Sequence, residues 1–448
     1  MEIRDFLKQA AAVRPSPRQL AWFDTEFYAF VHFSPNTYTG LEWGTGKEDP
    51  AIFNPTKFDP DQWVAAVKSA GMRGLVLTAK HHDGFCLWPS KYTEHSVKNS
   101  PWQGGKGDIV KEVAEACRRG GLKFGFYLSP WDRNCPLYGS DAYNDYYKAQ
   151  LTELLTGYGE IFHVWFDGAC GEGPNGKRQV YDFDGYIELI RKYQPNATIF
   201  NDKGPDVRWI GNESGTARAA EWAVVPHELC GLSERQTDGP VLSGSLSYLY
   251  NTDPYIGTMP EILYSRGLCF AGAEVDMSIR PGWFYHPEEE PHSLERLFNT
   301  YLTSVGGNAC FHLNIPPTPE GLFDERDVKR LKELGDKLHE TFAADLAEQA
   351  EIVKETLDSD TQVAWVVRFP QPTAVRYLML MEEISKGQRI ERFKVQARNA
   401  FGNWEAIYHG TTVGHKRICP LDGEARGELR VLVASARDEV LLRRIALF

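Results

Sequence analysis

The stretch GLVLTAKHHDGFCLWPS, residues 74–90, decides how the rest of the chain is interpreted. Its first six residues are mostly aliphatic or small, a run that favours a strand buried on both faces. Lys80, His81, His82 and Asp83 follow directly. The sequence therefore predicts a buried strand that ends in a cluster of titratable side chains.

The same pattern recurs from residue 26 to about 340, where short apolar runs alternate with amphipathic segments. Predicted strands cover residues 26–33, 74–80, 123–129, 161–168, 197–202, 273–280 and 308–317. Predicted helices cover residues 58–70, 107–121, 141–156, 181–193, 291–304 and 324–341. This alternation is typical of an α/β protein with a (β/α)8 (TIM) barrel. Because the region 203–272 blurs the count, we expect a distorted barrel with a weak sixth unit, within residues 1–343.

Past residue 345 the pattern changes to short alternating runs of apolar and polar residues separated by turn signals such as FGNW. This texture predicts a C-terminal antiparallel β-sandwich over residues 344–448. Its aromatic residues are interpreted mainly as core, and sugar binding by this domain is the alternative. They are Trp365, Tyr377, Trp404 and Tyr408.

Composition narrows the functional classes. The 448 residues carry a net charge of −12 with no basic block, which argues against nucleic acid as a partner. No run of about 18 apolar residues occurs, which argues against a membrane span. The first twenty residues lack the apolar core of a secretory signal, and the eight cysteines are scattered without a CxxC pair. We therefore expect reduced thiols and a cytoplasmic location.

Polar and aromatic residues gather at the ends of the predicted strands, where the active sites of such barrels lie. These residues are His32, Lys80, His81, His82, Asp83, Tyr127, Trp131, Trp165, Asp167, Asn201, Asp202, Asp276, Arg280, Trp283, His312 and Asn314. Their predicted positions bring them to the mouth of one pocket. Aromatic residues are 12% of the chain, which suits the binding of sugar rings, although composition alone favours their use as core.

Three kinds of chemistry could use this set. Adjacent His81 and His82 would point to opposite faces of a strand, which argues against a metal site. No GxSxG elbow is present, which argues against a serine nucleophile of that type. Glycoside hydrolysis remains, because it needs two carboxyl groups in a pocket of aromatic and hydrogen-bonding side chains.

Six motifs carry a resemblance to a known family. They are HFSPNTYTGLEWGTGKE (32–48), KHHDGFCLWPS (80–90), KFGFYLSPWD (123–132), HVWFDG (163–168), VRWIGNESG (207–215) and RPGWFY (280–285). In this order they resemble the α-L-fucosidases of glycoside hydrolase family 29, over about residues 20–340. The segments GLEWGTGKE and RWIGNE are more similar to the subfamily that prefers α-1,3- and α-1,4-linked fucose on branched glycans than to the broad-specificity subfamily.

The resemblance implies a retaining exo-fucosidase with no metal or organic cofactor and a fucosylated glycan as substrate. Asp167 matches the nucleophile of the family, and its alternative is a structural Asp that caps the following loop. Glu213 matches the acid/base residue. Its alternative is a solvated loop residue, in which case Glu172, Glu221 or Glu274 would be candidates.

The resemblance also implies the sugar-binding residues. His32, His81 and His82 would bind fucose hydroxyls, and Tyr127 would lie near the nucleophile. Trp165 and Trp283 would contact the C5-methyl face, whereas Glu42 and Trp43 would contact the outer hydroxyls. For the three histidines a purely structural role is the alternative. Asp83 is expected at most to orient a neighbouring imidazole, and Arg208 and Asp276 are left without a role.

Overall fold

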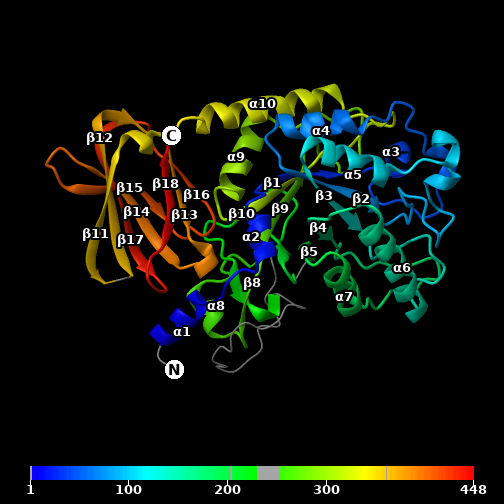
Figure 1. Cartoon of the computed structure of the whole chain (residues 1–448), viewed down its shortest axis with the longest axis horizontal. Coiled ribbons are helices and arrows are strands. Elements are labelled where there is room, and N and C mark those ends of the chain that lie inside the picture. Colours follow the sequence, from blue (N-terminus) through cyan, green and yellow to red (C-terminus); the bar gives the residue numbers. More distant parts are fainter. Residues whose placement is uncertain (1–2, 202–203, 230–252, 360) are drawn as a thin grey trace.

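The computed structural model describes residues 3–201, 204–229, 253–359 and 361–448. Eight parallel strands close into a barrel in the order β1-β10-β9-β6-β5-β4-β3-β2 (Figure 1). They are β1 (Phe27–Val31), β2 (Gly74–Lys80), β3 (Lys123–Leu128), β4 (His163–Trp165), β5 (Thr198–Asn201), β6 (Val207–Trp209), β9 (Gly272–Ser278) and β10 (Ala309–Asn314). The predicted barrel is confirmed.

The barrel strands are buried on both sides, which explains their continuous apolar runs. In β2, Leu75 and Leu77 belong to the layer between the strands and the outer helices. Val76 faces the barrel interior, where it shares a core with Tyr28 and Trp165. The interior is thus filled by large side chains up to the floor of the pocket.

Outer helices follow most strands and cover the barrel (Figure 1). They are α4 (Pro60–Ser69), α5 (Ile109–Gly120), α6 (Asp141–Gly157), α7 (Phe183–Tyr193), α9 (Leu294–Ser304) and α10 (Glu325–Phe342). Shorter helices are α1 (Ile3–Ala11), α2 (Pro17–Phe23), α3 (Asn36–Thr39) and α8 (Met259–Leu263). Asp59 and Asp108 cap the amino ends of α4 and α5 by accepting backbone hydrogen bonds.

The expected distortion lies at the sixth strand. β6 begins at Val207, only six positions after β5 ends at Asn201, so the connection is too short to hold a helix. The sequence did not identify β6 as a strand, because its three residues are too few to show a pattern. Between β6 and β9 the described chain forms a small antiparallel pair, β7 (Val224–Pro226) and β8 (Leu268–Phe270), and α8.

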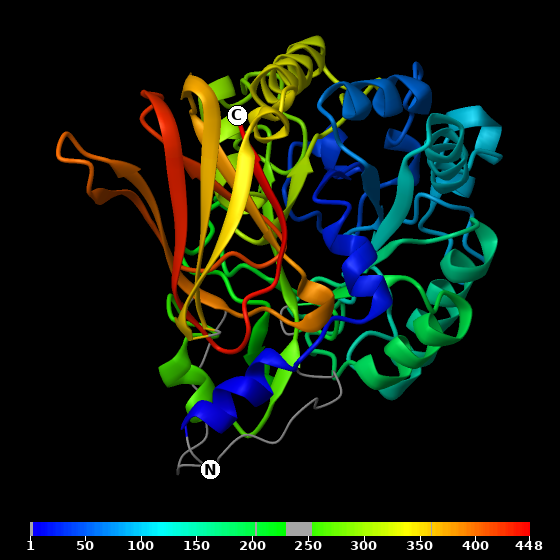
Figure 2. The same cartoon turned by 60° about the vertical axis from the view of Figure 1, so that its left-hand side comes forward.

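The C-terminal region forms two antiparallel sheets, as predicted, and these pack beside the barrel (Figures 1 and 2). One has the order β11-β12-β17-β14-β15 and the other β16-β13-β18. Their bounds are β11 (Glu351–Ser359), β12 (Gln362–Ala374), β13 (Tyr377–Glu382), β14 (Ile390–Arg398), β15 (Trp404–Gly410), β16 (Arg417–Pro420), β17 (Ala425–Ala436) and β18 (Leu442–Leu447). Val367 and Leu380 contribute to one core between the sheets, which Trp365 joins and Tyr408 borders. The predicted division between residues 343 and 344 falls in the connection that follows α10.

The two regions are joined by specific contacts. Glu26, at the start of β1, lies against His415 and Lys416, which precede β16. Gln388 donates to the carbonyl oxygen of Glu221 at 3.2 Å. α1 shares one core with barrel side chains and with Ile384 of the C-terminal region.

The cysteines correct one expectation. Six described cysteines are free thiols: Cys86, Cys117, Cys135, Cys170, Cys310 and Cys419. Cys269, in β8, is disulfide-bonded, so the expectation of reduced thiols throughout is wrong for this residue. Cys230 lies outside the described residues. The cytoplasmic location stays a prediction, and it loses the support of the cysteines because disulfides are rare in that compartment.

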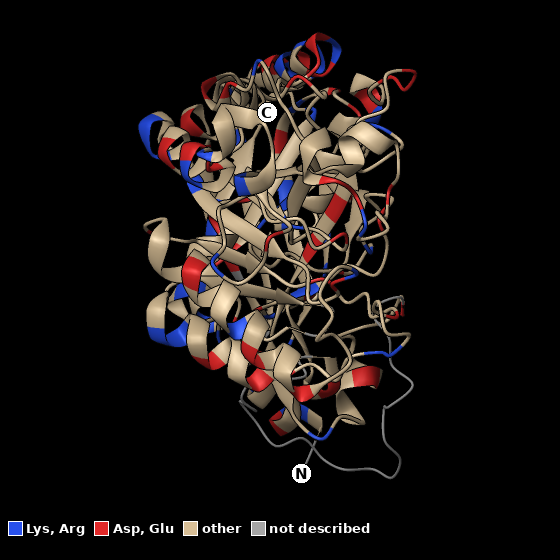
Figure 3. Cartoon of the chain, turned by 90° about the vertical axis from the view of Figure 1, so that its right-hand side faces the viewer, with Lys and Arg blue, Asp and Glu red and all other residues tan. Residues whose placement is uncertain are grey.

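Charges of both signs are interspersed on the outer helices of the face shown in Figure 3. Among the residues that the structure describes, no helix combines the length and the apolar character needed to cross a bilayer.

Candidate active site

A cavity of about 190 Å³ opens at the carboxyl ends of the barrel strands. All ten residues predicted to bind or react with a substrate line it: His32, Glu42, Trp43, His81, His82, Tyr127, Trp165, Asp167, Glu213 and Trp283. Phe30, Ala169 and Asp276 complete the lining. Several strands and loops that are far apart in the sequence thus contribute to one pocket.

Asp167 lies two residues beyond the end of β4 and is fixed by two donors. The hydroxyl of Tyr127 donates to Oδ2 at 3.0 Å, and the backbone N–H of Ala169 donates to Oδ1 at 2.8 Å. Burial and the nearby carboxylate raise the pKa of Tyr127 well above its ordinary value, so the phenol stays protonated and can donate. The carboxylate is therefore held in one orientation at the pocket wall.

His82 lies beside Asp167, with Nε2 at 3.7 Å from Oδ2. The hydroxyl of Ser129 donates to the carbonyl of Trp131 at 2.6 Å, so its oxygen accepts from Nδ1 of His82 at 2.7 Å. Burial lowers the pKa of His82, which favours the neutral ring. Its Nε2 therefore presents a lone pair to hydrogen-bond donors in the pocket.

His32, like His82, is held through Nδ1, which leaves its Nε2 for the pocket. Its Nδ1 donates to Oδ1 of Asn314 at 2.8 Å, while the amide nitrogen of Asn314 donates to Ser278 and to the carbonyl of Trp283. Burial lowers the pKa of His32 to about 3, so the ring is neutral. Its Nε2 is a second acceptor in the pocket.

His81 and His82 both line the cavity, and their ring centroids are 4.2 Å apart. The expectation that they point to opposite faces is wrong, because β2 ends at Lys80 and strand alternation does not extend to them. Burial lowers the pKa of His81 well below its ordinary value. Its Nδ1 has no hydrogen-bond partner within the described ranges.

Glu213 lies at the rim, and the indole N–H of Trp283 donates to its Oε2 at 3.1 Å. Although the side chain reaches solvent, the surrounding walls partly desolvate the carboxyl and raise its pKa. The Asp167 and Glu42 carboxylates raise this pKa further, and the Trp283 hydrogen bond opposes them. The site thus holds two carboxyls in different environments.

Aromatic rings form the inner walls. Trp165 stacks between Phe200, with centroids 4.0 Å apart, and Tyr127, with centroids 5.3 Å apart. Trp283 lies across the pocket near His32, at 5.1 Å between centroids. Apolar faces of this kind suit the C–H surface of a sugar.

Glu42 connects two loops at the rim. Its carboxylate accepts the backbone N–H of Trp283 at 2.9 Å and contacts Nε2 of His286 at 2.9 Å. It therefore supports the loop that carries Trp283 as well as lining the cavity.

Trp43 stands at the entrance with 60% of its surface exposed, edge-on to Trp131 at 5.6 Å between centroids. Arg133 lies over Trp131 and donates to the carbonyl oxygen of Gly44. A side chain at Gly46, where φ is +79°, would collide with the backbone of Arg133. Glycine at position 46 thus permits the close approach of the two rim loops.

The alternative acids are accounted for by position. Glu221 is fully buried in ion pairs with Arg208 and Arg218, away from the cavity. Glu274 is also fully buried, among barrel side chains, and Glu172 is exposed and does not line the pocket. Of these carboxyls only Glu213 lines the cavity.

Several residues at strand ends have supporting contacts instead. Lys80 is buried between Asp132 and Gln150, at 3.0 Å from each. Asp83 accepts from the Ser34 hydroxyl and the Phe85 backbone N–H, which differs from the expected contact with an imidazole. Asp202 lies outside the described residues.

Asp276 is a pocket residue to which sequence reasoning gave no role. It accepts the indole N–H of Trp209 at 2.9 Å, and burial raises its pKa well above its ordinary value. The available signal was its position in the predicted strand, two residues after Glu274 and therefore on the same face.

The described residues include no group of three or more His, Cys, Asp or Glu side chains arranged to hold a metal ion.

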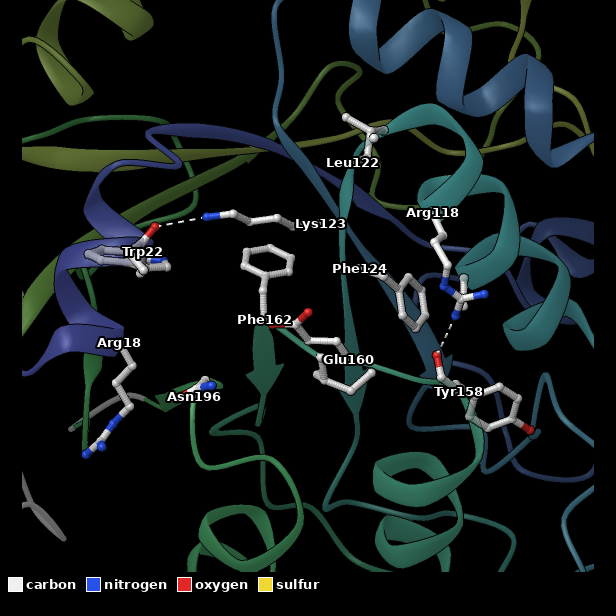
Figure 4. A pocket seen from close by; sticks show the side chains of 14 residues that line it. Arg18, Trp22, Arg118, Leu122, Lys123, Phe124, Tyr158, Glu160, Phe162 and Asn196 are labelled. Carbon is white, nitrogen blue, oxygen red and sulfur yellow. Dashed lines mark hydrogen bonds between the residues drawn. The ribbon is translucent and has the colours of Figure 1, made fainter.

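A larger cavity of about 540 Å³ lies at the opposite, amino-terminal end of the barrel (Figure 4). Its cationic groups already have partners. Arg18 pairs with Asp206, Lys123 donates to Ala21 and Thr25, and Arg118 donates to the carbonyl of Tyr158. In barrel enzymes this end serves stability, so the smaller cavity is the candidate active site.

Comparisons with known proteins agree with this site. Residues 17–227 and 260–341 match the α-L-fucosidase family. The protein named α-L-fucosidase 1 from Arabidopsis thaliana is 40% identical over 462 aligned positions, which cover 97% of this chain and 87% of that protein. The crystal structure of a glycoside hydrolase 29 family member from an unknown rumen bacterium has a TM-score of 0.85 and 39% identity, covering 98% of this chain and 77% of that one. A Ruminococcus gnavus GH29 fucosidase in complex with fucose has a TM-score of 0.84 and 29% identity, covering 98% and 95%. The chain therefore belongs to the α-L-fucosidases of glycoside hydrolase family 29.

Proposed function

We propose that this α-L-fucosidase is a retaining exo-enzyme that releases terminal α-1,3- and α-1,4-linked L-fucose from branched, Lewis-type glycans. The observation that carries the proposal is the pairing of Asp167 and Glu213 in a pocket of about 190 Å³. Such a pocket has room for one sugar ring at a chain end. The unlike surroundings of the two carboxyls suit unlike roles, as two-carboxylate glycosidases require.

In the first step, Oδ of Asp167 attacks C1 of the fucose and the bond from C1 to the glycosidic oxygen breaks. Glu213, whose pKa is raised, gives its proton to the departing oxygen. The product is a covalent fucosyl-enzyme and a free acceptor glycan. Tyr127 and the Ala169 N–H orient the attacking carboxylate.

In the second step, the Glu213 carboxylate accepts a proton from water as the water oxygen bonds to C1. The bond from C1 to Asp167 breaks, and both carboxyls return to their starting states. Two displacements at C1 leave the anomeric configuration unchanged.

The neutral histidines provide the means to recognise the sugar hydroxyls. Nε2 of His32 and Nε2 of His82 accept from hydroxyl groups, and His81 adds its Nδ1, which has no hydrogen-bond partner among the described residues. Trp165 and Trp283 contact the apolar face that carries the C5 methyl group.

The linkage preference rests on the entrance. Trp43, at the entrance of the fucose-sized pocket, forms an aromatic and cationic rim together with Trp131 and Arg133. A branched acceptor places a second sugar beside the fucose, and this rim offers it a surface on which to stack. A simple aryl group would use less of that surface.

The test is to measure L-fucose release from a Lewis-type branched trisaccharide, 2′-fucosyllactose and an aryl α-L-fucoside, with early products followed by ¹H NMR. We expect strong release from the branched glycan alone, with α-L-fucose as the first anomer. Comparable release from all three substrates would mean broad specificity, and a first product of β configuration would overturn the retaining mechanism. No release from any substrate would favour a fucose-binding protein without turnover.

A further inference from the structure

Directly beneath the pocket, a single carboxylate sits at the centre of the barrel. Glu274 of β9 is fully buried, as are His163 and His312, which flank it. An ionised carboxylate has no donor of its own and can accept up to about four hydrogen bonds. Glu274 accepts three hydrogen bonds, from side chains on the strands β1, β4 and β10, and His163 of β4 lies beside it.

The two oxygens divide these partners between them. Oε1 accepts the indole N–H of Trp165 at 2.7 Å and Nδ1–H of His312 at 2.9 Å. Oε2 accepts the hydroxyl of Tyr28 and lies 3.1 Å from Nε2 of His163. Burial alone would favour the protonated carboxyl, but the two imidazoles outweigh it and hold the pKa of Glu274 well below its usual value.

Trp165 depends on this carboxylate for its orientation. Stacking between Phe200 and Tyr127 restrains the plane of the indole but does not itself fix the direction of the N–H within that plane. The hydrogen bond from its N–H to Glu274 supplies that direction. The ring so oriented is one that lines the cavity.

The same carboxylate also supports the rest of the floor. His312 stacks on Phe30 with ring centroids 4.1 Å apart. Phe30 lines the cavity, and its ring centroid lies 5.3 Å from that of Trp165. His163, the other inward-facing residue of β4, lies four positions before Asp167. One buried group therefore connects both aromatic parts of the floor and the strand that leads to the nucleophile.

We infer that Glu274 is a positioning residue, which sets the in-plane orientation of Trp165 and thereby the fit of the sugar against the pocket floor. This inference rests on the proposed role of Trp165 in binding fucose. It assigns to Glu274 no contact with the substrate and no proton transfer.

A double-mutant cycle tests it. We expect Glu274→Gln to raise the KM for an aryl α-L-fucoside about tenfold when Trp165 is present, because a hydrogen bond to a charged acceptor is weakened. In the Trp165→Phe background, which has no indole N–H, the same change should raise KM less than about twofold. Equal factors in both backgrounds would show a merely structural role and overturn the inference.

Tyr28→Phe is the matched control, because it removes a donor to the same carboxylate but leaves the Trp165 contact intact. It should change KM less than about twofold; an increase as large as that of Glu274→Gln would contradict the inference. If Glu274→Gln does not fold, Glu274→Asp replaces it, since a shorter carboxylate cannot reach the indole.

A readout independent of activity separates this inference from the proposed function. In a ¹H–¹⁵N spectrum, the indole proton of Trp165, assigned through Trp165→Phe, should lie downfield and move upfield in Glu274→Gln. An indole proton that does not move would overturn the inference. A chain that releases no fucose but shows the shift would contradict the proposed function alone.

Discussion

The indole N–H of Trp283 donates to Oε2 of Glu213 at 3.1 Å, so a residue of the aromatic wall is bonded to the proposed acid. This contact favours the ionised carboxyl, whereas partial burial and the neighbouring Asp167 and Glu42 favour the protonated one. The pKa of Glu213 is raised because burial and the two neighbouring carboxylates outweigh the Trp283 hydrogen bond.

Trp283→Phe should therefore raise the pKa of Glu213 further. Since the protonated form is the active acid, activity falls as pH rises through this pKa, and the alkaline limb of kcat/KM should move to higher pH. The measurement is a pH profile on the branched trisaccharide. A limb that stays in place, or moves to lower pH, would contradict the role of this hydrogen bond.

Glu213→Ala should affect substrates according to their leaving groups. Natural glycans need a proton on the departing oxygen and should lose about 10²-fold or more in kcat, whereas aryl fucosides with acidic phenols should lose far less in the bond-breaking step. Glu172→Ala is the control, because this exposed residue does not line the cavity. An equal loss on both kinds of substrate would show that Glu213 is not the acid.

Asp167→Ala should abolish turnover while the protein still folds, because the side chain is partly exposed and its two donors can bond to water. Azide can enter the vacated space and attack C1 from the same face, so it should restore release of an activated leaving group and yield β-L-fucosyl azide. Near-normal activity without azide would refute the assignment of the nucleophile.

Trp43→Ala should distinguish the contribution of the rim to substrate binding from that of the inner pocket. We expect kcat/KM for the branched trisaccharide to fall about tenfold, and that for an aryl fucoside by less than about twofold, because only the larger acceptor reaches the rim. Phe401→Ala is the aromatic control, since Phe401 is 88% exposed at the turn between β14 and β15. Equal losses on both substrates would place Trp43 in fucose binding itself.

The barrel and the lining of its pocket could be predicted because parallel strands buried on both faces leave an unmistakable apolar run, and their polar ends converge by topology. The placement of Asp167 and His82 in one cavity follows from this rule. Side-chain direction beyond a strand end does not, which is why His81 and His82 were expected on opposite faces.

Other features depend on partners that are distant in the sequence. The side chains around Glu274 belong to residues 28, 163, 165 and 312, so its role as a buried acceptor had no local signal. The same holds for Asp276, whose raised pKa arises from burial and from Glu274 and Glu213. Three-residue strands such as β6 are too short for periodicity to identify.

Glu26 gives a prediction about stability and pH at the contact between the barrel and the sandwich. Burial opposes its ionisation, but the hydrogen bond with His415 and the charge of Lys416 outweigh burial and lower its pKa from 4.5 to about 2. A carboxyl whose pKa is lowered by folding stabilises the protein above its unfolded pKa, and this stabilisation is lost as pH falls through the folded pKa. The window here runs from about pH 4.5 down to about pH 2.

Glu26→Gln should therefore reduce the free energy of unfolding by about 2–3 kcal/mol at pH 7 and by about half of that or less at pH 3, as measured by urea denaturation. Glu320→Gln is the control, because its pair with Lys57 is exposed on both sides and should contribute little at either pH. If the deficit of Glu26→Gln were the same at pH 7 and pH 3, the loss would come from packing and not from the charge. A deficit that shrinks at acid pH would show that the charge of Glu26 stabilises the contact between the C-terminal sheets and β1. Because β1 carries Phe30 and leads to His32, the same ion pair would support the strand that places both residues in the pocket.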